Sequence, residues 1–452
     1  MIKKDPVGRE WGISRRRFLR SAAAAGAGLA LAQGVSGQES QSPARPDDLN
    51  VAIIGVGEQG RVLIEAAVRI PGVRFKAVCD IWSFSQRLAA GRLKSYGHDV
   101  AVYEDYREML DKEKGHLDAL IVATPDWVHA EHAIAGLDAG LDVYCEKEMS
   151  NSLEKARQMV EAARRTGRKL QIGHQRRSNP RYQHAIDKLI HEVRLLGRVT
   201  HANAQWNRAV SEELGWAKNY EIPQETLNRH GYATMREFRN WRWFKKYGGG
   251  PIVDLGSHQI DLFSWVFQAN PKAVQASGGT NYYKDYEWYD NVMAIYEYDS
   301  PEGVARAFYQ VLTTTAYGLF KEVFMGLDGS IEISEIPSSG NHALREKHAP
   351  PWEKWARMGL LAQYRAPAAP ATTEVIADVR PSKPLDAWPL PARLAKPAHQ
   401  PHLENFFDSI RYDVPLNCPA EIGYETAVAV LRANDAVEAR RRLEFKPEEF
   451  QV

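Results

Sequence analysis

The sequence predicts an α/β protein whose N-terminal domain contains a doubly wound parallel sheet. Short apolar runs alternate with helix-like stretches between residues 49 and 145, as in strands that are joined by helices. A glycine-rich turn follows the first apolar run. Beyond about Val199 the runs become longer and alternate in polarity, which predicts the strands of a second domain.

The composition is that of a soluble protein with two or three domains. The 452 residues exceed one ordinary domain, and 44% hydrophobic with 25% charged residues exclude a disordered, collagen-like or membrane-spanning chain. Lysine and arginine number 58 against 57 acidic residues, a net charge of +1, so we expect no nucleic-acid partner. The three cysteines, Cys79, Cys145 and Cys418, include no C-x-x-C pair, which predicts neither a disulfide framework nor a metal site.

Residues 1–38 are interpreted as a bacterial export signal. Arginines at 15–17 precede Phe18 and a small-residue apolar run over 21–32, too short for the roughly 18 residues that span a bilayer. The arginines resemble the twin-arginine signal that exports folded proteins. We expect a periplasmic protein without a membrane span after cleavage; an ordinary signal peptide and an uncleaved anchor are the alternatives. Residues 39–48 are predicted to form a polar linker.

The first structural unit carries a dinucleotide-binding pattern. The apolar strand 50–54 leads into Gly55-Val56-Gly57-Glu58-Gln59-Gly60, a helix-like stretch over 61–68, and a second strand over 74–79 that ends at Asp80. In a G-x-G-x-x-G turn the glycines let the backbone approach a pyrophosphate, while the acid accepts hydrogen bonds from ribose hydroxyls. The alternative is a structural turn in an unrelated βαβ unit.

The acid at position 80 favours NAD over NADP. A carboxylate there repels a 2′-phosphate, and no basic residue follows before Arg87. NADP remains the alternative, with Arg87 or Arg92 folding back to bind the phosphate.

Further strand-helix units extend this domain to residue 172. We predict strands at 100–103, 117–123 and 141–145 and helices at 105–112 and 127–139. Ligands of such sheets bind beyond the carboxyl ends of the strands, where residues 124–129 and 146–148 lie. The domain is assigned to 49–172 and the remainder, 173–452, to a second domain.

The sequence resembles the glucose–fructose oxidoreductase, inositol dehydrogenase and rhizopine catabolism (Gfo/Idh/MocA) family. The resemblance covers about 50–445 and is carried by the glycine turn, by A-T-P-x-x-x-H at 123–129, by Cys145-Glu146-Lys147, by G-H-Q-R-R at 173–177 and, most strongly, by GGGPIVDLGSHQID at 248–261. It implies a Rossmann domain followed by an α/β domain with a large, mostly antiparallel sheet that covers the substrate and mediates homo-oligomers.

The resemblance also implies roles for individual residues. Lys147 is placed at the reaction centre, with Asp254 and His258 completing the catalytic set and His258 as general acid/base. Because Asp254 and His258 are four residues apart, they share one face if a helix begins after the glycines; Asp254 at a helix cap and a structural His258 are the alternative. The expected cofactor contacts are Gly55, Gly57, Glu58, Gln59, Gly60, Asp80, Thr124, Pro125, His129, Glu146 and Lys147.

One position departs from the family. A proline commonly follows the Glu-Lys pair, whereas this chain has Glu148. Glu148 either pairs with Lys147, or acts as an additional acid/base, or faces solvent.

Possible substrate contacts are less specific. Arg176, Tyr182 and His174 lie at positions where members of the family often contact the cofactor or the substrate. The alternatives are that Arg176 is a surface residue and that Tyr182 belongs to the core. Trp206, Trp241 and Trp243 are candidates for stacking on a sugar face, with a place in the sheet core as the alternative.

The remaining segments of the second domain are assigned coarsely. Residues 209–246 are interpreted as an insertion that covers the substrate. Strands are expected at 274–283, 291–298 and 305–313. Residues 350–401 contain ten prolines, which excludes regular helix or central strand and suggests a wrapping arm or an oligomer contact. Closing helices are expected within 402–440.

Three functions are consistent with these features. The first is an NAD(P)-dependent oxidoreductase acting on a sugar, polyol or glycoside hydroxyl, with a tightly bound cofactor regenerated in place because no free NAD pool is expected outside the cytoplasm. The second is an NAD-dependent glycoside hydrolase or lyase that works by transient oxidation, elimination and re-reduction. The third is a carbohydrate-binding protein without catalysis, for which Glu148 is the only argument.

Overall fold

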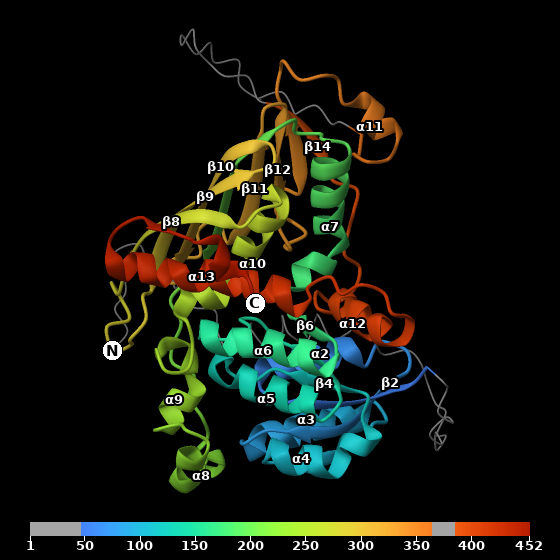
Figure 1. Cartoon of the computed structure of the whole chain (residues 1–452), viewed down its shortest axis with the longest axis vertical. Coiled ribbons are helices and arrows are strands. Elements are labelled where there is room, and N and C mark those ends of the chain that lie inside the picture. The colour runs from blue at the N-terminus through green and yellow to red at the C-terminus, as the bar shows by residue number, and fades with distance from the viewer. Residues whose placement is uncertain (1–46, 364–384) are drawn as a thin grey trace, which may run out of the picture. The chain divides into compact units, whose positions relative to one another are not determined.

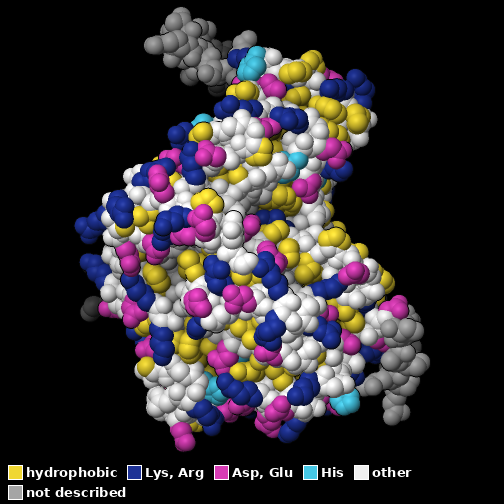
Figure 2. All heavy atoms as spheres, viewed as in Figure 1, with side chains coloured by type: hydrophobic (Ala, Val, Ile, Leu, Met, Phe, Trp, Pro, Cys, Tyr) yellow, Lys and Arg dark blue, Asp and Glu magenta, His cyan; other side chains and the backbone are white. Residues whose placement is uncertain are grey.

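The computed structural model describes residues 47–363 and 385–452. The predicted signal segment, the linker up to residue 46 and residues 364–384 of the proline-rich segment lie outside these ranges. Among the described residues, no helix is long and apolar enough to cross a membrane. Acidic and basic side chains are interspersed over the face shown in Figure 2, as the near-zero net charge predicts.

The N-terminal domain contains the predicted parallel sheet. Its six strands lie in the order β3-β2-β1-β4-β5-β6, all parallel, which is the doubly wound order with a switch point between β1 and β4. Strands β1, β4 and β5 are almost completely buried, which explains their uninterrupted apolar runs. The strands are β1 (Leu49–Ile54), β2 (Val73–Cys79), β3 (Ala101–Tyr103), β4 (Ala119–Val122), β5 (Asp142–Cys145) and β6 (Leu170–Ile172).

Five helices connect these strands. They are α2 (Glu58–Ala67), α3 (Ser83–Ser95), α4 (Tyr106–Glu113), α5 (Asp126–Asp138) and α6 (Leu153–Thr166). The predicted strands and helices between 100 and 145 are confirmed within a few residues. Helix α3 was not predicted because it buries only Ser85, Ala89 and Leu93, so its apolar stripe is weak. The three cysteines are buried and unpaired.

The second domain contains a large, mostly antiparallel sheet, as the resemblance implied. Nine strands lie in the order β14-β13-β12-β11-β7-β10-β9-β8-β15, and only the pair β7–β10 is parallel. They are β7 (Val199–Asn207), β8 (Pro271–Gly279), β9 (Asn291–Ser300), β10 (Gly303–Leu312), β11 (Phe320–Gly326), β12 (Gly329–Ile333), β13 (His342–Arg345), β14 (Asp386–Pro389) and β15 (Leu443–Glu444).

The prediction that one strand runs to residue 283 is wrong. Strand β8 ends at Gly279, and the chain then turns around the carboxylate of Asp290, which accepts the backbone N–H groups of Tyr282 and Tyr283 at 2.6 and 3.0 Å. The aromatic run that suggested a strand belongs to this loop.

Helices join the two sheets into one body (Figure 1). Helix α13 (Ala420–Ala439) packs against α10 (Gly250–Phe267) and β8 on one side and against α6 on the other. Helix α12 (Gln400–Tyr412) packs on α2. The predicted closing helices are therefore confirmed, and they fix the second domain over the carboxyl ends of the parallel strands.

The proline-rich segment contains more regular structure than expected. Its described part holds the five-residue helix α11 (Glu353–Arg357) and strand β14. Strand β14 lies at the sheet edge, where Pro389 costs no ladder hydrogen bond on its free side.

Residues 209–246, which we call the arm, leave β7 and return to α10. The arm contains short helical turns, including η4 (Lys218–Tyr220), α8 (Gln224–Arg229), α9 (Met235–Arg239) and η5 (Trp241–Trp243). Its apolar side chains form a separate cluster with Trp82, Phe84 and Trp127 of the N-terminal domain. The arm thus packs on the parallel-sheet domain as well as on the loop between β8 and β9 of its own domain.

Candidate active site

A cavity of about 1150 Å³ lies at the carboxyl ends of the parallel strands. Its walls come from the glycine turn, the ends of β2, β4 and β5, the arm, the start of α10 and strand β11. This volume exceeds the usual range for a drug-sized ligand, so the cavity has room for a dinucleotide and a second small molecule.

The glycine turn has the shape that a pyrophosphate requires. Gly55 has φ +84°, and a Cβ there would lie 2.6 Å from the backbone of Ala123. A Cβ on Gly60 would lie 2.0 Å from the carbonyl oxygen of Gly55, whereas one on Gly57 would meet nothing within 4 Å. The backbone is therefore tightly closed behind the turn and open toward the cavity at the N-terminus of α2, the favourable position for an anion.

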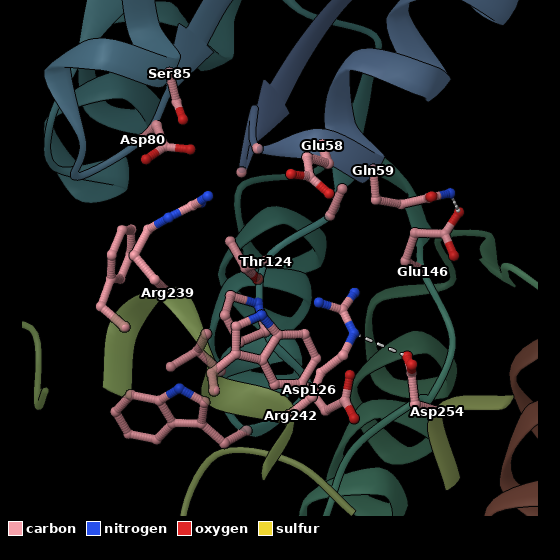
Figure 3. A pocket seen from close by; sticks show the side chains of 18 of the residues that line it. Glu58, Gln59, Asp80, Ser85, Thr124, Asp126, Glu146, Arg239, Arg242 and Asp254 are labelled. Atoms are coloured by element: carbon pink, nitrogen blue, oxygen red, sulfur yellow. Dashed lines mark hydrogen bonds and ion pairs between the residues drawn. The ribbon is translucent and has the colours of Figure 1, made fainter. Parts of the chain in front are cut away.

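Asp80 ends β2 at one side of the cavity. Its carboxylate accepts the backbone N–H groups of Val56 at 2.9 Å and Trp82 at 2.8 Å, and burial raises its pKa to about 6. Arg239 of the arm extends toward it (Figure 3). The two basic residues considered as phosphate ligands are engaged elsewhere: Arg87 lies over the ring of Tyr220, and Arg92 pairs with Glu65.

Gln59 and Glu146 meet on the opposite wall (Figure 3). The Gln59 amide donates to Oε1 of Glu146 at 3.1 Å and to Nε2 of His399 at 3.0 Å. The hydroxyl of Tyr144 also donates to Oε1 of Glu146. His399 comes from the end of the proline-rich segment, so this network links three distant parts of the chain around the cavity.

Lys147 and Asp254 are adjacent, as the resemblance implied. The Lys147 ammonium donates to the backbone carbonyl of Asp254 and lies 3.6 Å from its carboxylate. Arg242 of the arm donates to the same carboxylate at 3.0 Å (Figure 3). Burial alone would raise the pKa of Asp254, but the Arg242 and Lys147 cations lower it well below its ordinary value. Asp254 is therefore an ionised anchor for two cations.

His258 lies on the same helix as Asp254, one turn further. Helix α10 begins at Gly250 after Gly249, so the prediction of a shared helix is confirmed and Asp254 does not cap it. Burial and the nearby Lys147 cation lower the pKa of His258 well below its ordinary value. The ring is therefore neutral at neutral pH.

Glu148 does not face solvent, contrary to one of our alternatives, because its side chain is completely buried. Its Oε1 accepts the backbone N–H of Met149 at 2.8 Å, and its Oε2 has no partner among the described residues. Burial raises its pKa to about 8. The Lys147–Glu148 peptide bond is cis. No ion pair with Lys147 is found in the described part of the chain, because that ammonium is directed at Asp254.

His129 lies behind the cavity wall instead of lining it. Its ring nitrogens lie 2.7 Å from the carbonyl oxygen of Glu148 and 2.6 Å from that of Thr124. The histidine thereby connects the two loops that follow β4 and β5. Thr124 and Pro125 line the cavity directly.

Arg176 and Tyr182 are buried and are not among the lining residues of the cavity. Arg176 pairs with Glu322 at 2.5 Å and with Glu335 at 2.9 Å, and the hydroxyl of Tyr182 donates to Glu322 at 2.7 Å. The structure thus places neither side chain for direct contact with a ligand. The surface alternative for Arg176 is also wrong.

The three candidate tryptophans, Trp206, Trp241 and Trp243, all line the cavity, as do Trp82 and Trp127. Trp206 lies between His258, with ring centroids 5.8 Å apart, and Phe320, at 4.6 Å. Trp243 stacks on Tyr286 of a neighbouring loop at 4.9 Å. Trp206 both lines the cavity and packs against the main hydrophobic core, and the stacking partners found for Trp206 and Trp243 are protein rings.

Several lining residues were not singled out from the sequence. They are Asp126, Gln175, Arg208, Arg239, Arg242, Glu335 and His399. Burial raises the pKa of Asp126 to about 7. Asp126 and Gln175 lie in the motif segments 124–129 and 173–177 identified from the sequence, but no local pattern indicates that the side chains of the other five point into a cavity.

The fold and the cavity define a dinucleotide-binding protein with the two-domain architecture of oxidoreductases. The N-terminal residues 49–174 match the family model "Oxidoreductase family, NAD-binding Rossmann fold", and residues 185–332 match "GFO/IDH/MocA C-terminal domain". Together these models match more than half of the chain. The chain therefore belongs to the Gfo/Idh/MocA oxidoreductase family.

Individual relatives are distant. The rhizopine catabolism protein MocA of Rhizobium meliloti is 27% identical over 49% of this chain and 58% of its own length. An α-N-acetylgalactosaminidase of Shewanella oneidensis is 28% identical over 58% of this chain and 59% of its own. The chain thus spans less than two thirds of these relatives.

Solved structures share the fold. An NAD-binding protein from Listeria innocua has a TM-score of 0.65 at 21% identity and covers 89% of this chain and 99% of its own. The WlbA dehydrogenase of Bordetella pertussis, solved with NADH and UDP-GlcNAcA, has a TM-score of 0.60 at 18% identity and covers 88% and 99%.

Proposed function

We propose that this protein is an NAD-dependent oxidoreductase that acts on a hydroxyl group of a sugar, polyol or glycoside. The observation that carries the proposal is the meeting of Lys147, Asp254 and His258 in one cavity with the open glycine turn. A nicotinamide held beside them supplies a hydride acceptor. The MocA protein, the galactosaminidase and the WlbA dehydrogenase bear names or ligands that point to sugar-like substrates.

Each side chain has a separate role in the oxidation of the substrate hydroxyl. Neutral His258 takes the hydroxyl proton as hydride leaves the carbon. The Lys147 ammonium donates to the substrate oxygen and stabilises its developing negative charge. Asp254 holds the ammonium in place, and Arg242 keeps Asp254 ionised.

Substitution of the two reacting residues tests this proposal. The NAD-loaded protein is screened with glucose, myo-inositol and p-nitrophenyl α-N-acetylgalactosaminide. On a substrate that the wild-type protein accepts, His258→Ala and Lys147→Ala are each expected to lower kcat by about 10²- to 10⁴-fold, with NAD still bound. His201→Ala, on an exposed part of β7, serves as the control. A kcat equal to that of the wild-type protein in either site variant would contradict the proposal.

We propose NAD rather than NADP as the cofactor, and propose that it stays bound between turnovers. Asp80 disfavours a 2′-phosphate, and Arg87 and Arg92 are engaged elsewhere. The arm supports retention, because Arg239, Tyr232 and Phe238 of the arm line the same cavity as the glycine turn. A cofactor that does not exchange suits an exported protein, whose net reaction is then redox-neutral.

The second candidate is an NAD-dependent glycosidase. Oxidation of one hydroxyl acidifies the neighbouring C–H; loss of that proton expels the glycosidic oxygen, water adds, and return of the hydride completes a net hydrolysis. The likeness to the α-N-acetylgalactosaminidase and the arm over the cavity favour it. A binding protein without catalysis ranks third, since Lys147, Asp254 and His258 are all present.

Export and self-association complete the proposal. The arginines at 15–17 and the apolar run after them support twin-arginine export to the periplasm.

The open face of the large sheet exposes Met293, Ile295 and Phe308 on neighbouring strands, which supports a homo-oligomer through this sheet. Mixed surface charge supports the absence of a nucleic-acid partner.

A further inference from the structure

Glu335 is a carboxylate held in a fixed orientation at the substrate side of the cavity. It follows strand β12 and lines the same cavity as His258, with 14% of its side chain exposed. Its Oε2 accepts from Nε of Arg176 at 2.9 Å. Among the residues that the structure describes, its Oε1 has only a long contact of 3.5 Å from the Gln175 amide. One oxygen is therefore anchored and the other retains unused acceptor capacity.

The anchor of this carboxylate is itself rigid. Arg176 is only 1% exposed and has a second, completely buried carboxylate partner in Glu322, whose other oxygen accepts the hydroxyl of Tyr182. The guanidinium carbon also lies 5.4 Å from the ring centre of Trp206, and Trp206 stacks on His258. A continuous set of contacts therefore fixes Glu335 relative to the proposed general base.

We propose that Glu335 binds hydroxyl groups of the substrate and thereby orients the reacting hydroxyl toward His258 and Lys147. A carboxylate accepts hydrogen bonds from hydroxyl donors and, with two oxygens, suits a vicinal diol. It repels a carboxylate or phosphate, so the part of the substrate facing it is neutral and rich in hydroxyls. Arg176 and Tyr182 then act as positioning residues behind Glu335. The inference rests on the proposed sugar-directed function.

Calorimetric titration tests the inference on the NAD-loaded protein, with glucose, myo-inositol and methyl α-N-acetylgalactosaminide as probes. At least one probe is expected to bind the wild-type protein. Glu335→Gln keeps the shape but loses the charge, so it should bind that probe about tenfold or more weakly, as the loss of a charge-assisted hydrogen bond predicts. Glu332→Gln is the matched control, because Glu332 lies on β12, the strand that Glu335 follows, but pairs with Lys321 and does not line the cavity.

Two results overturn the proposal: equal affinity in the wild-type protein and Glu335→Gln, or no binding of any probe to the wild-type protein. Glu335→Asp is a second variant for the case in which Glu335→Gln does not fold. It keeps the charge on a shorter side chain. If Glu335→Asp bound the probe with the same affinity as the wild-type protein, this would also contradict the proposal. Nicotinamide absorbance separates this inference from the proposed function. Weaker binding by Glu335→Gln, with no absorbance change on sugar addition to the wild-type protein, would support recognition and reject oxidation.

Discussion

Glu148 is a buried carboxyl group directly after the lysine of the proposed reaction centre. It is completely buried, and the backbone N–H of Met149 is its hydrogen-bond donor among the described residues. Burial raises its pKa to about 8, with the nearby Asp126 carboxylate adding to the effect. The group is therefore protonated in the folded protein near neutral pH, while the same carboxyl is ionised in the unfolded chain.

This difference predicts a pH-dependent loss of stability. Between the unfolded pKa, about 4.3, and the folded pKa of about 8, the folded state binds one more proton at Glu148, so the free energy of unfolding falls as pH rises. The slope is at most about 1.4 kcal/mol per pH unit. Glu148→Gln removes this titration, so its melting temperature relative to wild type should rise between pH 5 and 8.

Thermal unfolding of the cofactor-free proteins over this range measures the effect. Glu225→Gln, at an exposed position in the arm, is the control and should track the wild-type protein at every pH. A difference between Glu148→Gln and wild type that stays constant with pH would contradict the buried, protonated state.

The spacing of residues along the sequence predicted part of the site. The other site residues are brought together only by the tertiary fold. Asp254 and His258 are four residues apart in one helix, so a local argument brings them together. Arg242 and Glu335 reach the cavity from segments far from Lys147 in the sequence, and nothing in their neighbours indicates it. The burial of Glu148 likewise depends on distant elements, which is why the solvent-facing alternative stayed open.

The arm is held on the N-terminal domain by more than apolar contacts. The indole of Trp82 donates to the carbonyl of Tyr220 at 2.6 Å, and that of Trp127 to the hydroxyl of Tyr232 at 3.3 Å. Arg229 also pairs with Glu104 of the N-terminal domain. We propose that these contacts hold the arm against the glycine turn and so slow the release of a ligand bound between them.

Weakening the arm should therefore speed the release of NAD. Leu227 of α8 is 1% exposed in the apolar cluster and does not line the cavity. Leu227→Ala removes packing worth about 2–5 kcal/mol, so NAD dissociation, followed by stopped-flow fluorescence, should accelerate at least about tenfold. Leu361→Ala, equally buried beneath the large sheet, controls for general destabilisation. Unchanged release from Leu227→Ala would show that the arm does not retain the cofactor.

Elements with a strong local pattern were the predictable ones. Strands β1, β4 and β5 are apolar throughout because both faces are buried, and α13 carries a long helical period. The sequence predicted that the second domain contains a large, mostly antiparallel sheet. It did not predict the parallel pairing of β7 with β10 or the strands β11 to β14. Pairing between segments about a hundred residues apart leaves no trace in either segment alone.

At the scale of the whole molecule, the open face of the large sheet predicts self-association. Met293 and Ile295 on β9 are 43% and 46% exposed, and Phe308 lies directly opposite Ile295 on β10. Ile295→Asp places a charge in this patch and should shift the protein to a smaller species in analytical ultracentrifugation. Leu88→Asp, at a similarly exposed position on α3, should not. An unchanged mass for Ile295→Asp would exclude this face as the interface.

The arm beside the cavity and the proposed export both favour a cofactor that travels with the protein. Denaturing mass spectrometry of protein purified without added nucleotide measures this most directly. The account predicts about one NAD released per chain on unfolding. An empty protein that binds and exchanges NAD freely would contradict the retained cofactor and point to an ordinary soluble-cofactor dehydrogenase, and released NADP would contradict the reading of Asp80.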